Sequence, residues 1–111
     1  MAFQSADLTP VFHALADPTR LAVIEQLCRG PAAITQLAAP YAMALPSFLK
    51  HVRVLEAAGL VTTEKRGRIR QVRLEPARLS AASDWFRDRR MLWNGRLDRL
   101  EALINQDGEG S

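Results

Sequence analysis

Apolar residues recur at helical spacing in the first quarter of the chain and predict two consecutive helices. The first is expected over residues 8–16. The second is expected to begin at Asp17-Pro18, because an acidic N-cap followed by proline is a strong helix start. It should end at Gly30-Pro31, and its buried stripe is expected to comprise Leu21, Ile24, Leu27 and Cys28.

A short strand at residues 32–34 and a short helix capped by Thr35 are expected next. Pro40 should end or kink that helix, because proline lacks the backbone donor and clashes with the preceding turn. The following helix, about residues 45–58, is called the reading helix below. Its apolar positions fall on one face (Phe48, Val52 and Leu55).

The polar residues of the reading helix lie largely off that apolar face: Ser47, Lys50, His51 and Arg53. A helix with one apolar and one basic face suits a DNA groove, because the apolar face anchors it while the other meets phosphates and base edges. The alternative is an ordinary amphipathic surface helix, and the helix by itself does not separate the two.

A strongly basic hairpin, the wing, is predicted directly after this helix at about residues 60–74. Gly67 can supply the positive φ of a tight turn between the two strands. Val72 and Leu74 alternate with charged residues, as in a half-buried strand. The wing carries Arg66, Arg68 and Arg70. A solvated charged hairpin is the alternative, but the order helix, strand, basic hairpin is that of a winged helix-turn-helix.

The last third predicts one long helix, about residues 78–105. Its apolar stripe repeats every seven residues (Leu79, Phe86, Trp93, Leu100), and Leu97 and Ile104, also seven apart, lie on the adjoining face. This is more apolar surface than a small domain can cover, so the helix is expected to pack on a partner.

Composition and charge narrow the class of protein. The 111 residues suit one domain, here expected to span residues 1–111. Net charge is +3, but residues 44–76 hold seven Lys/Arg against three Asp/Glu, so they carry +4 and the remainder −1. The excess therefore lies in the reading helix and the wing, which suggests a polyanionic partner.

Several functional classes are disfavoured by what the sequence lacks. A single cysteine, Cys28, excludes a disulfide framework within the chain. There is no bilayer-spanning apolar run, and the first residues lack signal-peptide features, so we expect no membrane partner and a cytoplasmic location.

An enzyme is also disfavoured, because no Gly-rich phosphate loop is present. Ser47 and His51 lie one helical turn apart, which a DNA-facing helix also shows, so no enzyme is predicted.

Three motifs resemble those of the ArsR/SmtB family of winged-helix regulators: residues 14–20 (Ala-Leu-Ala-Asp-Pro-Thr-Arg), residues 50–61 and Arg66-Gly67-Arg68. The resemblance covers residues 8–105. It implies a mainly α fold with a small β-hairpin in the order α-α-α-α-β-β-α, and homodimers formed through the first and last helices. The dimer interface would include Leu8, Phe12, Phe86, Trp93, Leu97, Leu100 and Ile104.

The resemblance also implies operator DNA as the partner, usually with repression as the outcome. By this resemblance the DNA-contacting residues would be Ser47, Leu49, Lys50, His51, Arg53, Arg66, Arg68 and Arg70. The family usually has serine where this chain has Ala44 and Leu49. Leu49 cannot donate a hydrogen bond, but it can contact a thymine methyl group.

The family's metal sites use ligands that this chain lacks. Residues 35–45 contain no Cys, His, Asp or Glu, and residues 78–105 contain no His. The chain is therefore similar to the branch without a metal motif, so we expect no metal and no cofactor, and the effector is left open. The function predicted is a homodimeric, sequence-specific DNA-binding regulator, a repressor, on a palindromic double-stranded operator. The alternative is a winged-helix module that binds protein.

Overall fold

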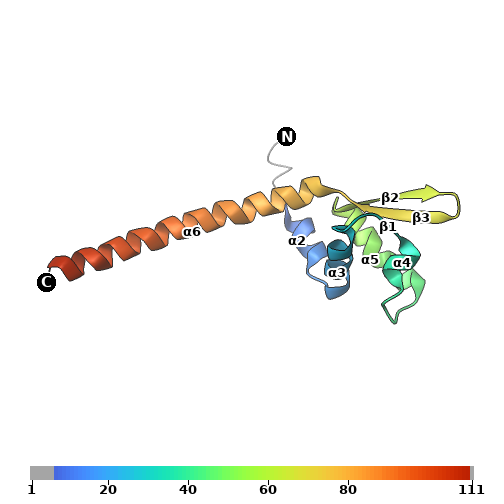
Figure 1. Ribbon diagram of the computed structural model, residues 1–111, viewed down its shortest axis with the longest axis horizontal. Coiled ribbons are helices and arrows are strands. Elements are labelled where there is room, and N and C mark those ends of the chain that lie inside the picture. Colours follow the sequence, from blue (N-terminus) through green and yellow to red (C-terminus); the bar gives the residue numbers. More distant parts are fainter. Residues whose placement is uncertain (1–6, 111) are drawn as a thin grey trace. The chain divides into compact units, whose positions relative to one another are not determined.

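The computed structural model describes residues 7–110, with side chains described from Asp7 to Gln106. The chain divides into two units, up to Ala81 and from Ala82 onward. The first unit holds the helices α2 (Thr9–Leu15), α3 (Pro18–Leu27), α4 (Ile34–Ala38) and α5 (Leu45–Ala57), the strands β1 (Ala32–Ala33), β2 (Val61–Arg66) and β3 (Ile69–Leu74), and the start of α6 (Pro76–Gly110) (Figure 1). The second unit consists of α6 alone, so the single-domain interpretation stays a prediction.

The start of α3 follows from Asp17 and Pro18, as the sequence predicted. Asp17 has extended backbone angles, and its Oδ2 accepts a hydrogen bond from the backbone N of Arg20 at 3.1 Å. Pro18 occupies the first turn, where no backbone donor is needed. The preceding helix, α2, agrees with its expected range to within one residue at each end.

One expectation about the next segments was wrong. Thr35 does not cap α4, because the helix begins one residue earlier, at Ile34. The side chain of Gln36, at the third helical position, reaches back to accept a hydrogen bond from the backbone N of the N-cap residue Ala33 at 2.9 Å. The residue before Pro40, Ala39, is the C-cap, so the expected end of α4 is confirmed.

The buried stripe of α3 also differs from the expected one. Leu21 is 45% exposed and Cys28 is exposed, whereas Val23 lies in the core at 1% exposure beside Ile24 and Leu27. The face that packs is therefore rotated from the one inferred from spacing. Val23 and Leu21 both suit a helical stripe, and only the position of the neighbouring helices selects between them.

The expected apolar face of α5 is confirmed. Phe48, Val52 and Leu55 are buried at 0%, 3% and 0% exposure. The helix ends at a Schellman motif: Gly59 has φ of 78°, the backbone N of Leu60 donates to the carbonyl of Leu55, and that of Gly59 donates to Glu56. This turn leads the chain directly into β2.

The sheet has the order β1-β3-β2, and both pairings are antiparallel. The expected short strand is present: Ala32 pairs with Val72 and Ala33 with Gln71. In the wing, Arg66 pairs with Ile69, so Gly67 and Arg68 form a two-residue turn. Gly67 has φ of 63°, as expected for a hairpin turn with glycine first.

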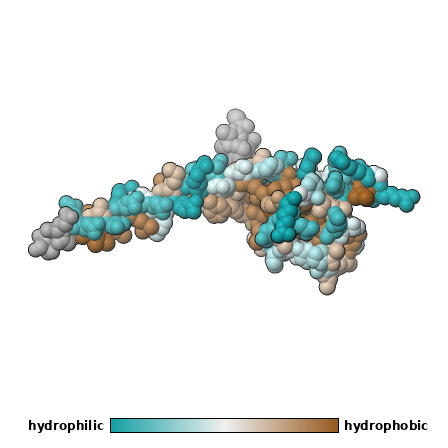
Figure 2. Space-filling model, in the orientation of Figure 1, coloured by the Kyte–Doolittle hydropathy of each residue, from teal (hydrophilic) through white to brown (hydrophobic). Residues whose placement is uncertain are grey.

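Helix α6 extends beyond its expected bounds, from Pro76 to Gly110 rather than over residues 78–105. Proline is compatible with a first helical turn, which explains the earlier start. Among the side chains described in the second unit, many large apolar ones are exposed: Phe86, Met91, Leu92, Trp93, Leu97, Leu100, Leu103 and Ile104, at 42–72%. Figure 2 shows brown apolar side chains along one edge of this helix and teal polar ones along the other.

Among the described residues, no helix has a continuous apolar stretch that could cross a bilayer.

Asp17 provides a prediction about acid stability. The hydrogen bond from the backbone N of Arg20 is the largest cause that lowers the pKa of Asp17; partial desolvation opposes it, and smaller contributions come from Arg20 and from His51 when its ring is charged. Stability from the charged carboxylate is therefore present above its unfolded pKa, near about 3.9, and is lost as pH falls through the lower folded value. We predict that Asp17→Asn is less stable than the parent at pH 7 and that this deficit shrinks below about pH 4. Urea unfolding of both proteins at pH 7, 5 and 3 measures it, and a deficit that grows toward pH 3 would contradict the assignment.

Candidate nucleic-acid interface

The outer face of α5 carries three exposed polar side chains. Ser47, Lys50 and Arg53 are exposed, whereas Phe48 and Val52 point into the core. Because successive residues are offset by about 100° around a helix, burial of one stripe directs the opposite one outward. The structure therefore brings together Ser47, Lys50 and Arg53 on one solvent-facing surface, as the sequence suggested.

The arginines of the wing differ in how they are held. Arg66 forms an exposed ion pair with Glu64 at 3.2 Å. The guanidinium of Arg70 donates to the hydroxyl of Thr63 at 3.0 Å. Arg68, in the turn, makes no hydrogen bond or ion pair within the described part of the chain and is fully available to a phosphate. Of the three wing arginines predicted to contact DNA, Arg66 and Arg70 therefore already have protein partners, whereas Arg68 has none among the described residues.

A groove of about 280 Å³ lies where the wing meets the start of α5. Its apolar lining includes Leu45, Leu49 and Ile69, and the guanidinium-bearing Arg68 and Arg70 flank it. Leu45 and Ile69 are 45% and 58% exposed, which is unusual for large apolar side chains on a basic surface. The structure therefore places Leu49 among other apolar groups, all open to a ligand from outside.

Sequence reasoning found Leu49 but missed Leu45 and Ile69. A signal for Ile69 was present, because it is out of phase with the buried Val72 in the two-residue period of β3 and so belongs to the other face of the strand. Leu45 could not be found in this way, because its position depends on how α5 meets the hairpin.

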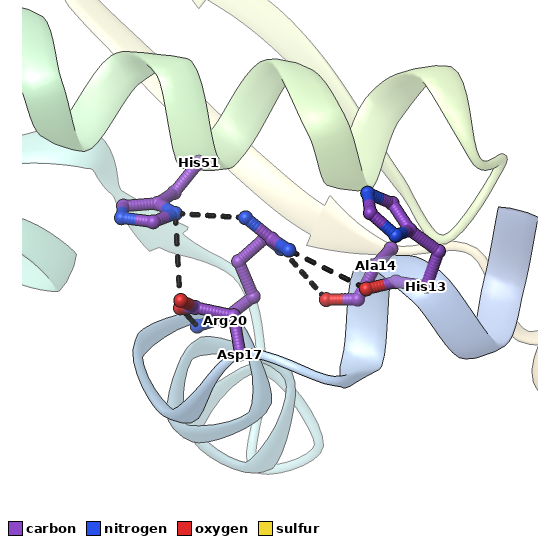
Figure 3. Close-up of polar contacts among 5 residues, drawn as sticks. All are labelled: His13, Ala14, Asp17, Arg20 and His51. Atoms are coloured by element: carbon purple, nitrogen blue, oxygen red, sulfur yellow. Dashed lines mark hydrogen bonds and ion pairs between the residues drawn. The ribbon is translucent and has the colours of Figure 1, made fainter.

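His51 has partners inside the protein. Its Nδ1 lies 3.1 Å from Nη1 of Arg20 and 3.7 Å from Oδ2 of Asp17 (Figure 3). Its side chain is only 23% exposed. The sequence grouped His51 with the DNA-contacting residues, and the structure adds that this ring faces α3.

Arg20 also binds the end of α2. Its Nε donates to the carbonyl of Ala14 at 2.7 Å, and its Nη2 lies 3.4 Å from the carbonyl of His13. The sequence supplied both halves of this network, the 14–20 motif and Lys50-His51, but assigned one to a helix start and the other to DNA. Their contact joins residues 31 positions apart, and local spacing carries no information about it.

The residues expected at a dimer interface fall into two groups. Leu8 is buried within the chain at 6% exposure and Phe12 is half-buried, so the first helix offers little free apolar surface. Phe86, Trp93, Leu97, Leu100 and Ile104 are each exposed by 42–63%. The apolar face of α6 is therefore the main candidate for a partner.

No cluster of three or more His, Cys, Asp or Glu side chains suited to a metal ion occurs among the described residues. Cys28 is exposed rather than packed as expected, because α3 turns Val23 instead toward the core.

Four helices, a basic hairpin and an outward polar helix face define a winged helix-turn-helix, the class of protein that presents one helix to DNA. A family model described as a helix-turn-helix domain matches residues 15–64. The chain is 34% identical over 98 residues to the HTH-type transcriptional regulator Rv2034 of Mycobacterium tuberculosis, covering 88% of this chain and 89% of that protein.

Solved structures agree. A crystal structure of an ArsR family transcriptional regulator, RHA00566, is 46% identical with a TM-score of 0.74, over 78% of this chain and 90% of that one. An ArsR-like transcriptional regulator from Rhodococcus sp. RHA1 is 27% identical with a TM-score of 0.74, over 93% and 96%. The chain belongs to the ArsR/SmtB family of winged helix-turn-helix transcriptional regulators, a non-enzymatic, DNA-binding class.

The apolar groove gives a prediction about thymine. A leucine in a DNA groove can pack on the 5-methyl group of thymine, which uracil lacks. We predict that replacing the contacted thymine by uracil in a bound duplex weakens binding about fourfold, the value of one buried methyl-sized group. Leu49→Ser should bind the two duplexes equally. Fluorescence anisotropy measures the four affinities, with uracil at a distal thymine as the matched control, and an unchanged uracil effect in Leu49→Ser would exclude Leu49.

Proposed function

We propose that this protein is a homodimeric repressor that recognises a palindromic operator through the outer face of α5. The observation that carries this proposal is the placement of Ser47, Lys50 and Arg53 on one exposed face whose opposite side is fixed in the core. A helix held in this way can enter a major groove with its side chains in a defined register.

The proposal divides the work between α5 and the wing. Side chains of α5 reach base edges, where hydrogen bonds distinguish sequences. Arg68 lies at a hairpin turn, where a long cation can follow the phosphate backbone or enter a minor groove. Arg66 and Arg70 contribute less, because each would first have to leave a protein partner.

The apolar face of α6 supports homodimerisation. A helix with this much exposed apolar surface is costly in water, and a second copy of the same helix offers a matching face. A two-fold dimer requires a two-fold operator, with half-sites about one helical turn apart. Leu8 is left out of the proposed interface because it is already buried.

The resemblance to the family favours repression over activation. A DNA-binding role is consistent with the cytoplasm as the proposed site of action.

The alternative is a winged-helix module that binds protein, with the wing serving only solubility. Selection of bound duplexes from a random library, followed by a salt titration, separates the two. Phosphate binding must weaken steeply as salt rises, whereas failure to enrich any sequence would favour the alternative.

The division of work predicts different effects for two arginines. Arg68→Ala should weaken binding to all duplexes similarly and reduce the slope of log K against log salt by about 1. Arg53→Ala should cost ~1–3 kcal/mol at one base position and relax the preference there.

Binding-site selection and salt titration of both variants measure these effects, and Arg66→Ala is the matched control for a wing arginine that already has a partner. If Arg68→Ala altered one base position and Arg53→Ala weakened every site equally, the two elements would have the opposite roles.

The proposed dimer predicts that replacing Trp93 weakens the association of the two subunits. Burial of a large apolar side chain stabilises by ~1.5–3 kcal/mol, so Trp93→Ala should raise the dimer dissociation constant by at least tenfold. The neighbouring exposed polar residue provides the control, because Asn94→Ala removes no apolar surface. Sedimentation equilibrium measures both, and a parent protein that is monomeric at micromolar concentration would rule out the proposed dimer.

A further inference from the structure

The contact between His51 and Arg20 determines which ring nitrogen of His51 carries a proton. A guanidinium offers only donors and is always charged, so Nη1 of Arg20 can hydrogen-bond Nδ1 of His51 only if that nitrogen is an acceptor. The ring must then be neutral, with its proton on Nε2. His51 in this arrangement is an acceptor and contributes no positive charge toward DNA.

Arg20 is held on its other sides. Nε binds the carbonyl of Ala14 at 2.7 Å, and the backbone N of Arg20 binds Asp17 at 3.1 Å. Arg20, at the start of α3, therefore connects through its guanidinium to the end of α2 and the middle of α5 (Figure 3). A rigidly held donor of this kind can fix the rotation of the helix whose side chain it binds.

We propose that His51 is a positioning residue for the DNA-reading face of α5, acting as the neutral acceptor of the Arg20 hydrogen bond. Lys50 is its immediate neighbour and Arg53 lies two residues further along, so a rotation of α5 at His51 would displace both. This inference rests on the proposed function, since it assigns a role within the same DNA-binding surface.

Protonation of Nδ1 would break this arrangement. A protonated ring has no acceptor for Arg20 and places two cations side by side, while its new N–H can turn toward Asp17, 3.7 Å away. Operator affinity should therefore fall as the ring becomes charged. A histidine that faced phosphates would do the opposite, because an added positive charge strengthens binding to DNA.

The groups around His51 support this direction of change. Asp17 and Arg20 face it from α3 and the turn before it, and α2 contributes backbone carbonyls to Arg20 through Ala14 and His13. On the β2 side of α5, the hydroxyl of Thr63 donates a hydrogen bond to the carboxylate of Glu56, and this contact lies more than one helical turn from His51. On α5 itself the nearest charges are Lys50 and Arg53, and the protein has one other histidine, His13.

The test is a pH profile of DNA affinity. Binding of the full chain to its selected operator duplex is measured by anisotropy at constant ionic strength between pH 8 and pH 5.5, the range in which histidine titrates. The parent should lose about three- to tenfold in affinity toward pH 5.5, the value of one such hydrogen bond. His51→Asn, whose Oδ1 occupies the place of Nδ1 but does not titrate, should show a flat profile over the same pH range.

Two variants provide matched controls. His51→Ala lacks the acceptor and should be about three- to tenfold weaker at pH 8, again with a flat profile. His13→Asn removes the other histidine while keeping the backbone carbonyl, and it should keep the parent profile. An affinity that rises toward pH 5.5, or a parent profile unchanged in His51→Asn, would overturn the proposal.

Nitrogen-15 NMR of the imidazoles in the DNA-free protein separates this inference from the proposed function. At pH 8 we expect His51 with an unprotonated Nδ1 and a protonated Nε2, and Arg20→Gln should remove that tautomer preference. An Nδ1–H tautomer would overturn the inference whether or not DNA binds. If the NMR result is as expected and no duplex is bound at any pH, the proposed function fails and the positioning role fails with it, while the hydrogen bond stands.

Discussion

Burial of one face of α5 is the constraint on which the remaining structure depends. Phe48 and Leu55 are fully enclosed, and Val52 between them is nearly so. Removing such side chains from water is the dominant favourable term in folding. Because this burial fixes the rotation of α5, it also determines which side chains face outward. The outward polar surface of α5 is thus a consequence of the core, and Lys50 and Arg53 are exposed on it without needing contacts of their own.

The hydrogen bonds of Arg20 give this packing a defined geometry. Apolar burial is largely non-directional, so it allows a helix to rotate or slide by small amounts. The contacts of Arg20 with Ala14 and His51 are directional. The combination of a buried stripe with one polar connection explains how a small domain can hold a recognition surface in register.

The two units meet different physical demands. In the first, the large apolar residues are mostly enclosed, and no buried side-chain polar atom among the described residues lacks a partner. In the second, α6 exposes residues such as Trp93 and Leu97, which a single helix cannot enclose. An isolated helix has no core, so its stability and solubility depend on what covers that face.

Local sequence patterns determined the elements, and tertiary structure decided how they meet. Asp17-Pro18, Gly59 and Gly67 mark boundaries through backbone chemistry that acts within a few residues, so α3, α5 and the wing turn were all predictable. The apolar face of α5 was predictable for the same reason. By contrast, spacing could not decide that α3 buries Val23 rather than Leu21, that Ile69 and Leu45 line one groove, or that Arg20 reaches His51. Those outcomes depend on packing between segments distant in the chain, and the periodicity of one segment contains no record of its neighbours.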